Sequence, residues 1–362
     1  MPQQSIPAAV VGAAAALQHA ADPFIAREVV VSVPATSANL GPGFDCVALA
    51  LDLRNTFEVS IHPRAAGASG YGDCQVELAP SDADQPRLPD IEMGGDNLFC
   101  QAFTLLCERR HVTPPDLRVR ISALIPPSRG LGSSATAVVG GLLAANTLLG
   151  QPLTTTELLE LAVLCEPGGH ADNVAAALLG GLVVTGASEA GIVALPLPIA
   201  EALRAVVFIP DMPMSTVAGR ALLPERYSRG DLTFNLSRLA LLLGALHTGR
   251  FDTLGVAMDD RVHQPYREQL FPALRPLMAA ARAGGAHGAC LSGGGSSVLA
   301  LASRAEAPAT CAALQRAAQE TQTPGHCVIA DISRQGARAA LTTGLVGSAP
   351  QVDVTLDEGR LA

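Results

Sequence analysis

The sequence predicts a protein of two domains, each built from both helices and strands. Its 362 residues suffice for about two domains, and 49% hydrophobic against 16% charged residues is ample for buried cores. Both halves alternate short β-branched runs with segments of helical length, and residues 186–197 between them turn small and loosely patterned. We therefore expect an N-terminal extension over 1–26, domains over 27–187 and 188–345, and a tail over 346–362.

The first predicted strand is Glu28–Val33, a β-branched run that stops at Pro34. Residues 34–45, PATSANLGPGFD, then alternate turn formers with small polar groups, which predicts a sharply folded loop that carries Asn39 and Asp45. Such side chains also commonly hydrogen-bond their own backbone, and that alternative stays open. Asp52–Ile61 alternates as a second strand, hairpinned to the first.

The next elements lead into a glycine-rich loop. Residues 63–92 favour a long loop with a short strand at Gln75–Leu78, Asp96–Arg110 favours a helix with an Asp-Asn cap, and Leu117–Ile125 alternates as a strand. The stretch 126–150 follows, in which R-G-L-G-S-S at 129–134 runs into an uncharged apolar helix. The glycines let backbone N–H groups converge, the serines add hydroxyls, and the helix start adds a positive dipole end. We expect a phosphate-binding loop, although such a loop can also be a mere connection.

A third polar stretch closes the first half. Residues 154–157 form a capping box that opens a helix to about Cys165, and EPGGHADNV follows at 166–174. Its glutamate, histidine, aspartate and asparagine suit metal or substrate binding, but their spacing is not one of the usual zinc motifs. Leu178–Thr185 then predicts a buried strand.

The second half begins with a strand at Ala205–Ile209. A turn and a helix start follow, with Thr216 and Arg220 one turn apart on the same face, where the arginine can hold a carboxylate or simply be solvated. Helices are expected at Ser237–Leu246 and Phe251–Met258, followed by the polar run DDRVHQPYR at 259–267. Residues 288–301 favour a strand, a glycine turn and a strand, in which three glycines permit a very close backbone approach.

Composition excludes several classes of function. A net charge of −9 with scattered arginines gives no basic footprint for nucleic acid or for an acidic membrane surface. The 24 basic residues are all arginine, which excludes Schiff-base chemistry and a P-loop lysine. Eight cysteines without C-x-x-C spacing indicate buried thiols in a reduced compartment rather than disulfides or zinc, and we expect the cytoplasm.

Membrane insertion and export are not expected either. The Ala/Val run in residues 1–26 has no preceding basic residue, which disfavours an export signal and favours an Ala-rich helix. Later apolar stretches are too short or too interrupted to span a bilayer. We assign no role to the tail after about Ala340.

These motifs together resemble one known family. PATSANLGPGFD, PPSRGLGSSA, GGHADNVA, STVAGRALLP, DRVHQPYR and LSGGGSS occur here in the order seen in homoserine kinases, within the GHMP small-molecule kinase superfamily, over roughly residues 29–302. The resemblance implies an α+β GHMP kinase fold, with an N-terminal ribosomal-protein-S5-domain-2-like domain and a ferredoxin-like C-terminal domain. It implies ATP- and Mg²⁺-dependent phosphorylation of the L-homoserine side-chain hydroxyl to O-phospho-L-homoserine, for threonine synthesis, by a homodimer.

The resemblance also implies roles for individual residues. The ATP phosphates would be bound by Pro127, Arg129, Gly130, Leu131, Gly132, Ser133, Ser134 and Ala135, and Mg²⁺ by Ser134 and Glu166. The homoserine site would comprise Asn39, Asp45, His170, Asn173, Thr216, Arg220, Arg267, Gly293 and Gly294. Asp45 would pair with the ammonium group and the arginines with the carboxylate.

Catalytic roles would fall to Asn173, Arg220 and Ser134. Asn173 stands where related mevalonate kinases have an aspartate that is proposed as a base. Asp172 is adjacent but points elsewhere, because neighbouring side chains diverge. We therefore expect no side-chain base to be essential, so that the hydroxyl proton leaves to a phosphate oxygen or to water.

The third glycine motif departs from the family pattern. It usually reads S-G-A-G-P-[ST], whereas residues 292–297 read SGGGSS, and the spacing from Glu166 to His170 is also longer than usual. Two alternatives therefore accompany the kinase interpretation: a non-catalytic sensor of the same fold, and a kinase for another small alcohol. The second is disfavoured because Asp45 with Arg220 and Arg267 offers the opposite charges that an amino acid zwitterion needs.

Overall fold

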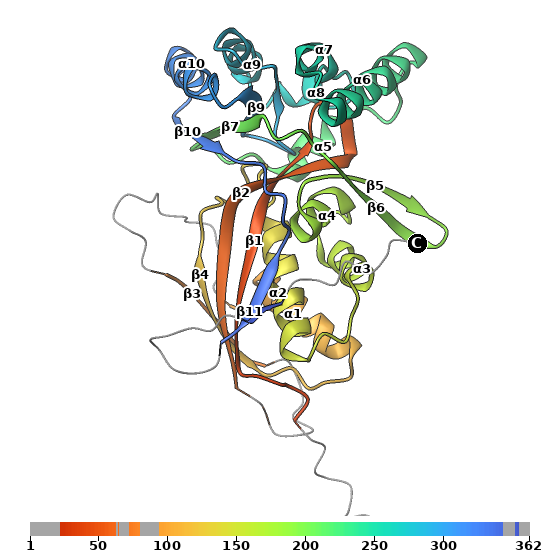
Figure 1. Ribbon diagram of the computed structural model, residues 1–362, viewed down its shortest axis with the longest axis vertical. Coiled ribbons are helices and arrows are strands. Elements are labelled where there is room, and N and C mark those ends of the chain that lie inside the picture. The colour runs from red at the N-terminus through yellow and green to blue at the C-terminus, as the bar shows by residue number, and fades with distance from the viewer. Residues whose placement is uncertain (1–21, 63, 65–71, 80–93, 343–351, 355–362) are drawn as a thin grey trace, which may run out of the picture.

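The computed structural model describes residues 22–62, 64, 72–79, 94–342 and 352–354, and it has two parts stacked along its long axis (Figure 1). The lower part is an eight-stranded sheet with four helices packed on one face, and the upper part is a four-stranded sheet with further helices. This mixed architecture confirms the predicted α+β class. Within the described residues, no helix is both long and apolar enough to cross a membrane.

The larger sheet has the strand order β12-β11-β1-β2-β4-β3, and a β5–β6 hairpin joins it through β2. All its strand pairs are antiparallel except β3 with β4, which is parallel. The strands are β1 (Glu28–Asn39), β2 (Gly43–His62), β3 (Cys74–Leu78), β4 (Asp116–Ser122), β5 (Leu182–Ser188), β6 (Gly191–Leu197), β11 (Arg338–Leu341) and β12 (Val352–Val354). The helices are α1 (Leu98–Arg109), α2 (Ser133–Leu148), α3 (Thr155–Cys165) and α4 (Ala171–Leu179).

The smaller sheet has the order β10-β7-β9-β8, the arrangement of a ferredoxin-like βαββαβ unit, as predicted. Its strands are β7 (Leu203–Pro210), β8 (Gly288–Leu291), β9 (Val298–Ser303) and β10 (Gly325–Ala330). The helices of this part are α5 (Thr216–Ala221), α6 (Arg229–Thr248), η1 (Phe251–Thr253), α7 (Leu254–Ala257), α8 (Gln264–Arg267), α9 (Leu274–Ala283) and α10 (Ala307–Glu320).

Local sequence explains where several helices begin. The Asn97 side chain accepts a hydrogen bond from the Phe99 N–H at 2.9 Å and so caps α1, as the Asp-Asn pattern indicated. Thr154 and Glu157 form the predicted capping box of α3. The apolar α2 is buried almost along its whole length against β1 and α1, which is why it carries no charge.

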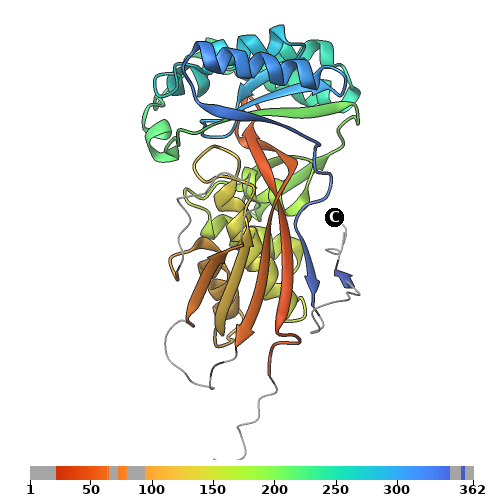
Figure 2. The same cartoon turned by 90° about the vertical axis from the view of Figure 1, so that its left-hand side faces the viewer.

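The β1–β2 hairpin links the two parts of the molecule, since its tip rises from the larger sheet to the smaller one (Figure 2). Leu40 and Leu49 near this tip share a hydrophobic cluster with Ala205 and Val207 of β7. The prediction that the first strand stops at Pro34 was wrong. The pairing register shifts between Pro34 and Ala35, and this bulge accommodates a residue without an N–H.

The structure also shifts the limits of other elements. Residues Leu178 and Leu179, expected in a strand, end α4, and the strand begins only at Leu182 because Gly180 and Gly181 turn the chain there. The expected boundary between residues 187 and 188 falls within the β5–β6 hairpin, and β11 returns to the larger sheet. We place the division near residue 198. The extension before residue 22 and most of the tail lie outside the described residues.

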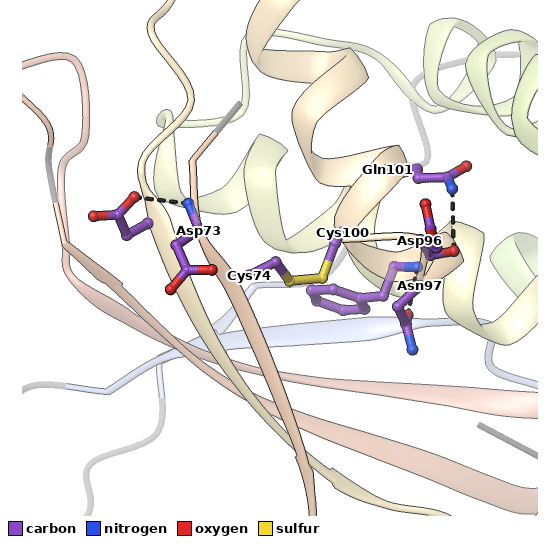
Figure 3. The surroundings of a disulfide bond; sticks show 8 residues. Asp73, Cys74, Asp96, Asn97, Cys100 and Gln101 are labelled. Carbon is purple, nitrogen blue, oxygen red and sulfur yellow. Dashed lines mark hydrogen bonds between the residues drawn. A yellow bond between two sulfur atoms is a disulfide. The ribbon is translucent and has the colours of Figure 1, made fainter. Parts of the chain in front are cut away.

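A disulfide bond joins Cys74 at the start of β3 to Cys100 on α1 (Figure 3). The prediction of thiols only was therefore wrong for this pair. The two cysteines are 26 residues apart, and nothing in that spacing reveals that β3 lies under α1. The other six cysteines, which include Cys46 and Cys290, are free.

Candidate active site

The R-G-L-G-S-S loop lies where the sequence predicted it, between β4 and the N-terminus of α2. Gly130 and Gly132 have φ angles of 72° and 70°, a left-handed conformation that side chains disfavour. Gly132 is the N-cap of α2 and has no side chain to cap the helix, so the first-turn N–H groups and the positive dipole end stay available. The loop has the geometry of an anion cradle.

The third glycine motif holds this loop from the other side. The Ser292 hydroxyl donates to the Gly130 carbonyl at 2.7 Å, and the Ser297 N–H donates to the Arg129 carbonyl at 3.0 Å. A Cβ on Gly130 would lie 2.1 Å from the Ser292 carbonyl oxygen. The close backbone approach expected for residues 293–295 therefore occurs, and it is to the R-G-L-G-S-S loop, which is the predicted phosphate loop.

The Arg129 side chain does not extend toward the cradle. Its guanidinium donates to the carbonyl oxygens of Pro127 at 2.8 Å and Asp211 at 2.6 Å. With 9% of the residue exposed, Arg129 braces the loop against the end of β7. The contact with ATP phosphates that the resemblance implies for Arg129 would therefore involve its backbone in this arrangement.

Ser134 and Glu166 lie together at the start of α2. The Ser134 hydroxyl donates to Glu166 Oε1 at 2.6 Å, and Glu166 Oε2 is buried with no hydrogen-bond partner among the described residues. Burial raises the pKa of Glu166 to about 7, against the lowering effect of the Ser134 hydrogen bond. Gly168 and Gly169, both with positive φ, fold the longer Glu166–His170 segment back on itself.

This oxygen pair fits Mg²⁺. A hydroxyl and a carboxylate oxygen without a partner are the hard ligands that Mg²⁺ prefers, and a nearby cation would favour the ionised form of Glu166. No group of three or more histidine, cysteine, aspartate or glutamate side chains in the described residues could hold a metal ion. The remaining ligands would therefore be phosphate oxygens and water, as Mg²⁺ commonly takes.

Asp45 and Arg220 form a two-pronged ion pair beside the cradle. Arg220 Nη1 lies 2.9 Å from Asp45 Oδ2, and Nη2 lies 2.6 Å from Oδ1. His170, at the N-cap of α4, places Nδ1 at 3.8 Å from Asp45 Oδ2, while burial lowers the pKa of its ring. The three residues that the sequence assigned to one pocket thus meet, coming from β2, α4 and α5.

Arg267 is a buried cation under this pair. It is 1% exposed, and Nη1 donates to the Gly293 carbonyl and contacts His263 Nδ1, both at 3.0 Å. Burial and then the charge of Arg220 lower the pKa of Arg267 to about 10, so it stays charged near neutral pH. Its Nε has no hydrogen-bond partner within the described chain.

Asn39 is placed as a structural link. Its Nδ2 donates to the Gly293 carbonyl at 2.9 Å, and its Oδ1 accepts the Asp45 N–H at 3.0 Å. Both ends of the amide are thus engaged, and the residue is 3% exposed. Asn39 therefore positions Asp45 and Gly293 and satisfies backbone groups, which is the alternative that the sequence left open.

Asn173 faces the phosphate loop from the first turn of α4. The Thr36 hydroxyl donates to Asn173 Oδ1 at 2.7 Å, and a Cβ on Gly132 would lie 2.0 Å from the same Thr36 oxygen. Asn173 Nδ2 donates to Asp172 Oδ1 at 3.2 Å, so the expectation that the Asp172 side chain points away from Asn173 was wrong, and one N–H of the amide remains. Asp172 is 2% exposed and accepts the Asn173 N–H at 2.7 Å, and burial raises its pKa to about 6.

The remaining predicted residues lie at the start of α5 and in the glycine turn. A Cβ on Gly294 would lie 3.2 Å from the Thr216 hydroxyl, so Thr216 borders the turn. The Gly293 N–H donates to the Ala38 carbonyl at 3.1 Å, and the Gly293 carbonyl accepts hydrogen bonds from Asn39 and Arg267. The turn is thus shared by the phosphate loop and by the charged pocket.

Sequence reasoning missed three contributors. Phe44 has the guanidinium carbons of Arg220 and Arg267 at 5.3 and 5.4 Å from its ring centre, and His263 stacks on it. Thr36 orients Asn173. Asp260 accepts the N–H groups of residues 262, 263 and 264 and so fixes the short α8 that carries Arg267. All three lie in stretches that were singled out, but only their packing distinguishes them.

Comparison with known proteins agrees with this geometry. Residues 97–181 match the GHMP kinases N terminal domain, and residues 242–320 match the GHMP kinases C terminal model. A homoserine kinase of Trichormus variabilis is 40% identical over 296 residues, which cover 82% of this chain and 93% of the relative. The chain belongs to the homoserine kinase family. The homoserine kinase of Synechocystis is 42% identical over 307 residues, covering 83% of this chain and 95% of the relative.

Solved structures extend the comparison to the fold. The crystal structure of a homoserine kinase from Cytophaga hutchinsonii superimposes with a TM-score of 0.75 at 25% identity, covering 87% of this chain and 98% of that one. The mevalonate kinase of L. major, in complex with R-mevalonate, gives a TM-score of 0.62 at 20% identity, with 85% and 98% covered. The second likeness shows the GHMP kinase fold alone, and it is consistent with the resemblance that the motifs indicated.

Proposed function

We propose that this protein transfers the γ-phosphoryl group of ATP to the side-chain hydroxyl of L-homoserine, which gives ADP and O-phospho-L-homoserine for threonine synthesis. The observation that carries the proposal is the shared glycine turn. Gly293 contacts the phosphate loop at Gly130 on one side and accepts a hydrogen bond from Arg267 on the other. An anion cradle and a pocket with both charges are thus joined at one point, which suits a kinase for an amino acid.

The phosphate loop would bind the triphosphate mainly through its backbone. The uncapped N–H groups of α2 from Ser133 onward, with Gly130 and Gly132 beside them, offer donors to phosphate oxygens. Because the chain has no lysine, neutralisation of charge falls to these dipoles, to arginine and to the metal. Ser134 and Glu166 would hold Mg²⁺, which when bound neutralises phosphate charge.

The charged pocket would hold the amino acid. The Asp45 carboxylate suits the substrate ammonium group, while Arg220 and Arg267 suit the carboxylate, since guanidinium binds carboxylate through two parallel hydrogen bonds. His170 and Thr216 border the pocket at Asp45 and at Gly294. Positioning both charged groups fixes where the hydroxyl lies, and positioning is the main source of rate enhancement in phosphoryl transfer.

The hydrogen bonds of Asn173 bear on the route of the hydroxyl proton. The Thr36 hydroxyl donates to Asn173 Oδ1, and Asn173 Nδ2 donates to Asp172 Oδ1, which leaves the second N–H of the amide for a ligand. That group donates a hydrogen bond to the substrate oxygen and cannot accept its proton. This supports transfer of the proton to a phosphate oxygen or to water, with Asn173 orienting the hydroxyl and Arg220 and Ser134 aligning the reactants.

Two expectations about the setting of the enzyme remain predictions. A cytoplasmic location suits a reaction that consumes ATP and a free amino acid, and cell fractionation tests it. A homodimer is expected from the family resemblance, and light scattering on the purified protein measures the mass directly.

Phosphorus NMR tests the reaction itself. Purified protein with MgATP should give a new phosphomonoester signal and ADP only when L-homoserine is added. Glu166→Gln should raise the Mg²⁺ concentration for half-maximal rate at least tenfold, a loss of about the size seen when groups around a metal are altered. Glu160→Gln, on the exposed side of the preceding helix, is the matched control and should leave the rate unchanged.

The outcomes separate the alternatives. Nucleotide binding without turnover of homoserine would refute the kinase and favour the sensor. Faster turnover of mevalonate or of a sugar would refute the amino acid pocket. An unchanged Mg²⁺ dependence in the Glu166 variant would refute the metal assignment alone.

A further inference from the structure

The two groups proposed to bind the opposite ends of homoserine bind each other in this structure. Arg220 holds both oxygens of Asp45, at 2.9 and 2.6 Å, in the geometry that an arginine adopts with a substrate carboxylate. The side chains are only 31% and 27% exposed, so each is largely withdrawn from water. A ligand that uses the same two nitrogens of Arg220 or the same two oxygens of Asp45 must therefore displace the partner.

The surroundings place weaker, less direct charges around the pair. Arg220 lies beside the Phe44 ring, which also contacts Arg267, a second cation that repels Arg220 and attracts Asp45. Asp45 has His170 at 3.8 Å, but burial lowers the pKa of that imidazole and so favours its neutral form. The acid Asp172 repels a charged Asp45 and attracts Arg220. Opening the ion pair therefore costs each partner its directly bonded counterion.

We propose that the Asp45–Arg220 ion pair is an internal substitute for the substrate zwitterion, and that it restricts the site to molecules carrying both an ammonium group and a carboxylate. This inference rests on the proposed placement of homoserine between the two residues. A zwitterion replaces one ion pair by two, because its carboxylate takes Arg220 and its ammonium takes Asp45. A ligand with one charge satisfies one partner and leaves the other without a counterion in a mostly buried site.

The inference predicts that the two charges of the substrate act cooperatively. Four alcohols with the same hydroxyl-bearing chain separate their contributions: L-homoserine, 4-hydroxybutyrate without the ammonium group, 3-aminopropan-1-ol without the carboxylate, and propan-1-ol without either. If the charges bound independently, the losses from removing each would multiply in propan-1-ol. If the ion pair must open first, removing one charge loses nearly as much as removing both.

The test measures dissociation constants by ligand-observed NMR titration in the presence of MgADP, so that it does not depend on turnover. In the wild type, each singly charged analogue should bind at least about 100-fold more weakly than homoserine, as loss of a hydrogen-bonded charge pair implies. Propan-1-ol should be no more than about threefold weaker than these analogues if the cooperativity argued from the ion pair holds.

Substituting either member of the ion pair gives a more specific test than the wild type alone, because the affinity for one analogue should rise. Asp45→Asn frees Arg220, so homoserine should bind at least about tenfold more weakly while 4-hydroxybutyrate binds at least about tenfold more tightly than to the wild type. Arg220→Gln should produce the mirror result, with tighter binding of 3-aminopropan-1-ol. Asp252→Asn is the matched control, because it removes the carboxylate of an exposed Arg250–Asp252 pair and should change none of the four constants.

The measurements distinguish a failure of this inference from a failure of the proposed substrate placement. Multiplicative losses in the wild type, or no gain for 4-hydroxybutyrate in Asp45→Asn, would overturn the inference even if homoserine is turned over. Unchanged homoserine binding in both variants would instead overturn the placement of the substrate. An unchanged MgADP affinity shows that the variants are folded, and a gain in affinity for one analogue cannot arise from misfolding.

Discussion

Replacing Gly130 by alanine tests whether the phosphate loop depends on its contact with the third glycine motif. At φ 72°, an alanine adopts a left-handed conformation that costs about 1–2 kcal/mol. The new Cβ would also lie 2.1 Å from the Ser292 carbonyl oxygen, whereas ordinary contacts begin at 3.4 Å. The loop and the turn must therefore separate by about 1.3 Å, the difference between these distances.

Gly181 provides the matched control. Its φ is 69°, but no atom lies within 4 Å of a Cβ added there, so Gly181→Ala carries the backbone strain without the collision. Both variants should lose about 1–2 kcal/mol of unfolding free energy from strain, measured by urea denaturation. Only Gly130→Ala should also lose about 100-fold in kcat/KM for ATP, the effect of a misplacement near 1 Å at a reacting group.

Comparing the kinetics of the two variants separates the effect of the collision with Ser292 from the effect of backbone strain. Steady-state kinetics with varied MgATP at saturating homoserine gives kcat/KM for the nucleotide, and varied homoserine shows whether the defect reaches the amino acid pocket. Equal kinetics for Gly130→Ala and Gly181→Ala would refute the argument that the backbone contact with Ser292 holds the loop in its binding geometry.

Three further predictions address other parts of the molecule. Phe44→Leu removes the ring between the two arginines and should raise KM for homoserine about tenfold at constant KM for ATP, with recovery in Phe44→Tyr; equal effects on both substrates would contradict it. Because burial raises the pKa of Asp172 to about 6, the folded state binds its proton more tightly, so stability falls as pH rises from about 4 to 6. In urea denaturation, Asp172→Asn should not show that loss of unfolding free energy with rising pH, which is up to about 3 kcal/mol in the wild type. The variant should also keep the basic limb of its pH–rate profile. Loss of that limb together with a very large drop in rate would instead identify Asp172 as a base. Changing both disulfide cysteines, Cys74 and Cys100, to serine should lower stability by about 3.5 kcal/mol for a separation of 26 residues at unchanged kcat, measured by thermal unfolding, and an unchanged midpoint would exclude a stabilising cross-link.

Much of the fold could be predicted because the local sequence patterns favour the same helices and strands that occur in the tertiary structure. The capping box at Thr154 and the uncharged run after Gly132 encode α3 and α2 directly. Pro34 misled the prediction, because the shift in pairing register that accommodates it depends on the partner strand. The Cys74–Cys100 bond was invisible for a similar reason, since only the packing of α1 on β3 brings the two cysteines together.

The site was predictable as a set of residues but not as a set of contacts. Sequence patterns identified Asp45 and Arg220 separately, yet nothing in them indicates that the two form an ion pair with each other. Asn39 was predicted at the substrate site, and the sequence did not indicate that its amide bonds the Gly293 carbonyl and the Asp45 N–H. Phe44 lies next to Asp45 in the sequence, and its importance follows only from the two cations beside its ring.

The position of β11 has a consequence for how the protein is made. In the larger sheet, Val31 of β1 faces Phe57 on one side and Ala339 on the other. During synthesis from the N-terminus, β1 gains its first neighbour early, but its second only after the helices described above and the whole smaller sheet have been translated. Until then β1 presents an open sheet edge to other nascent chains, a template for association that β11 closes.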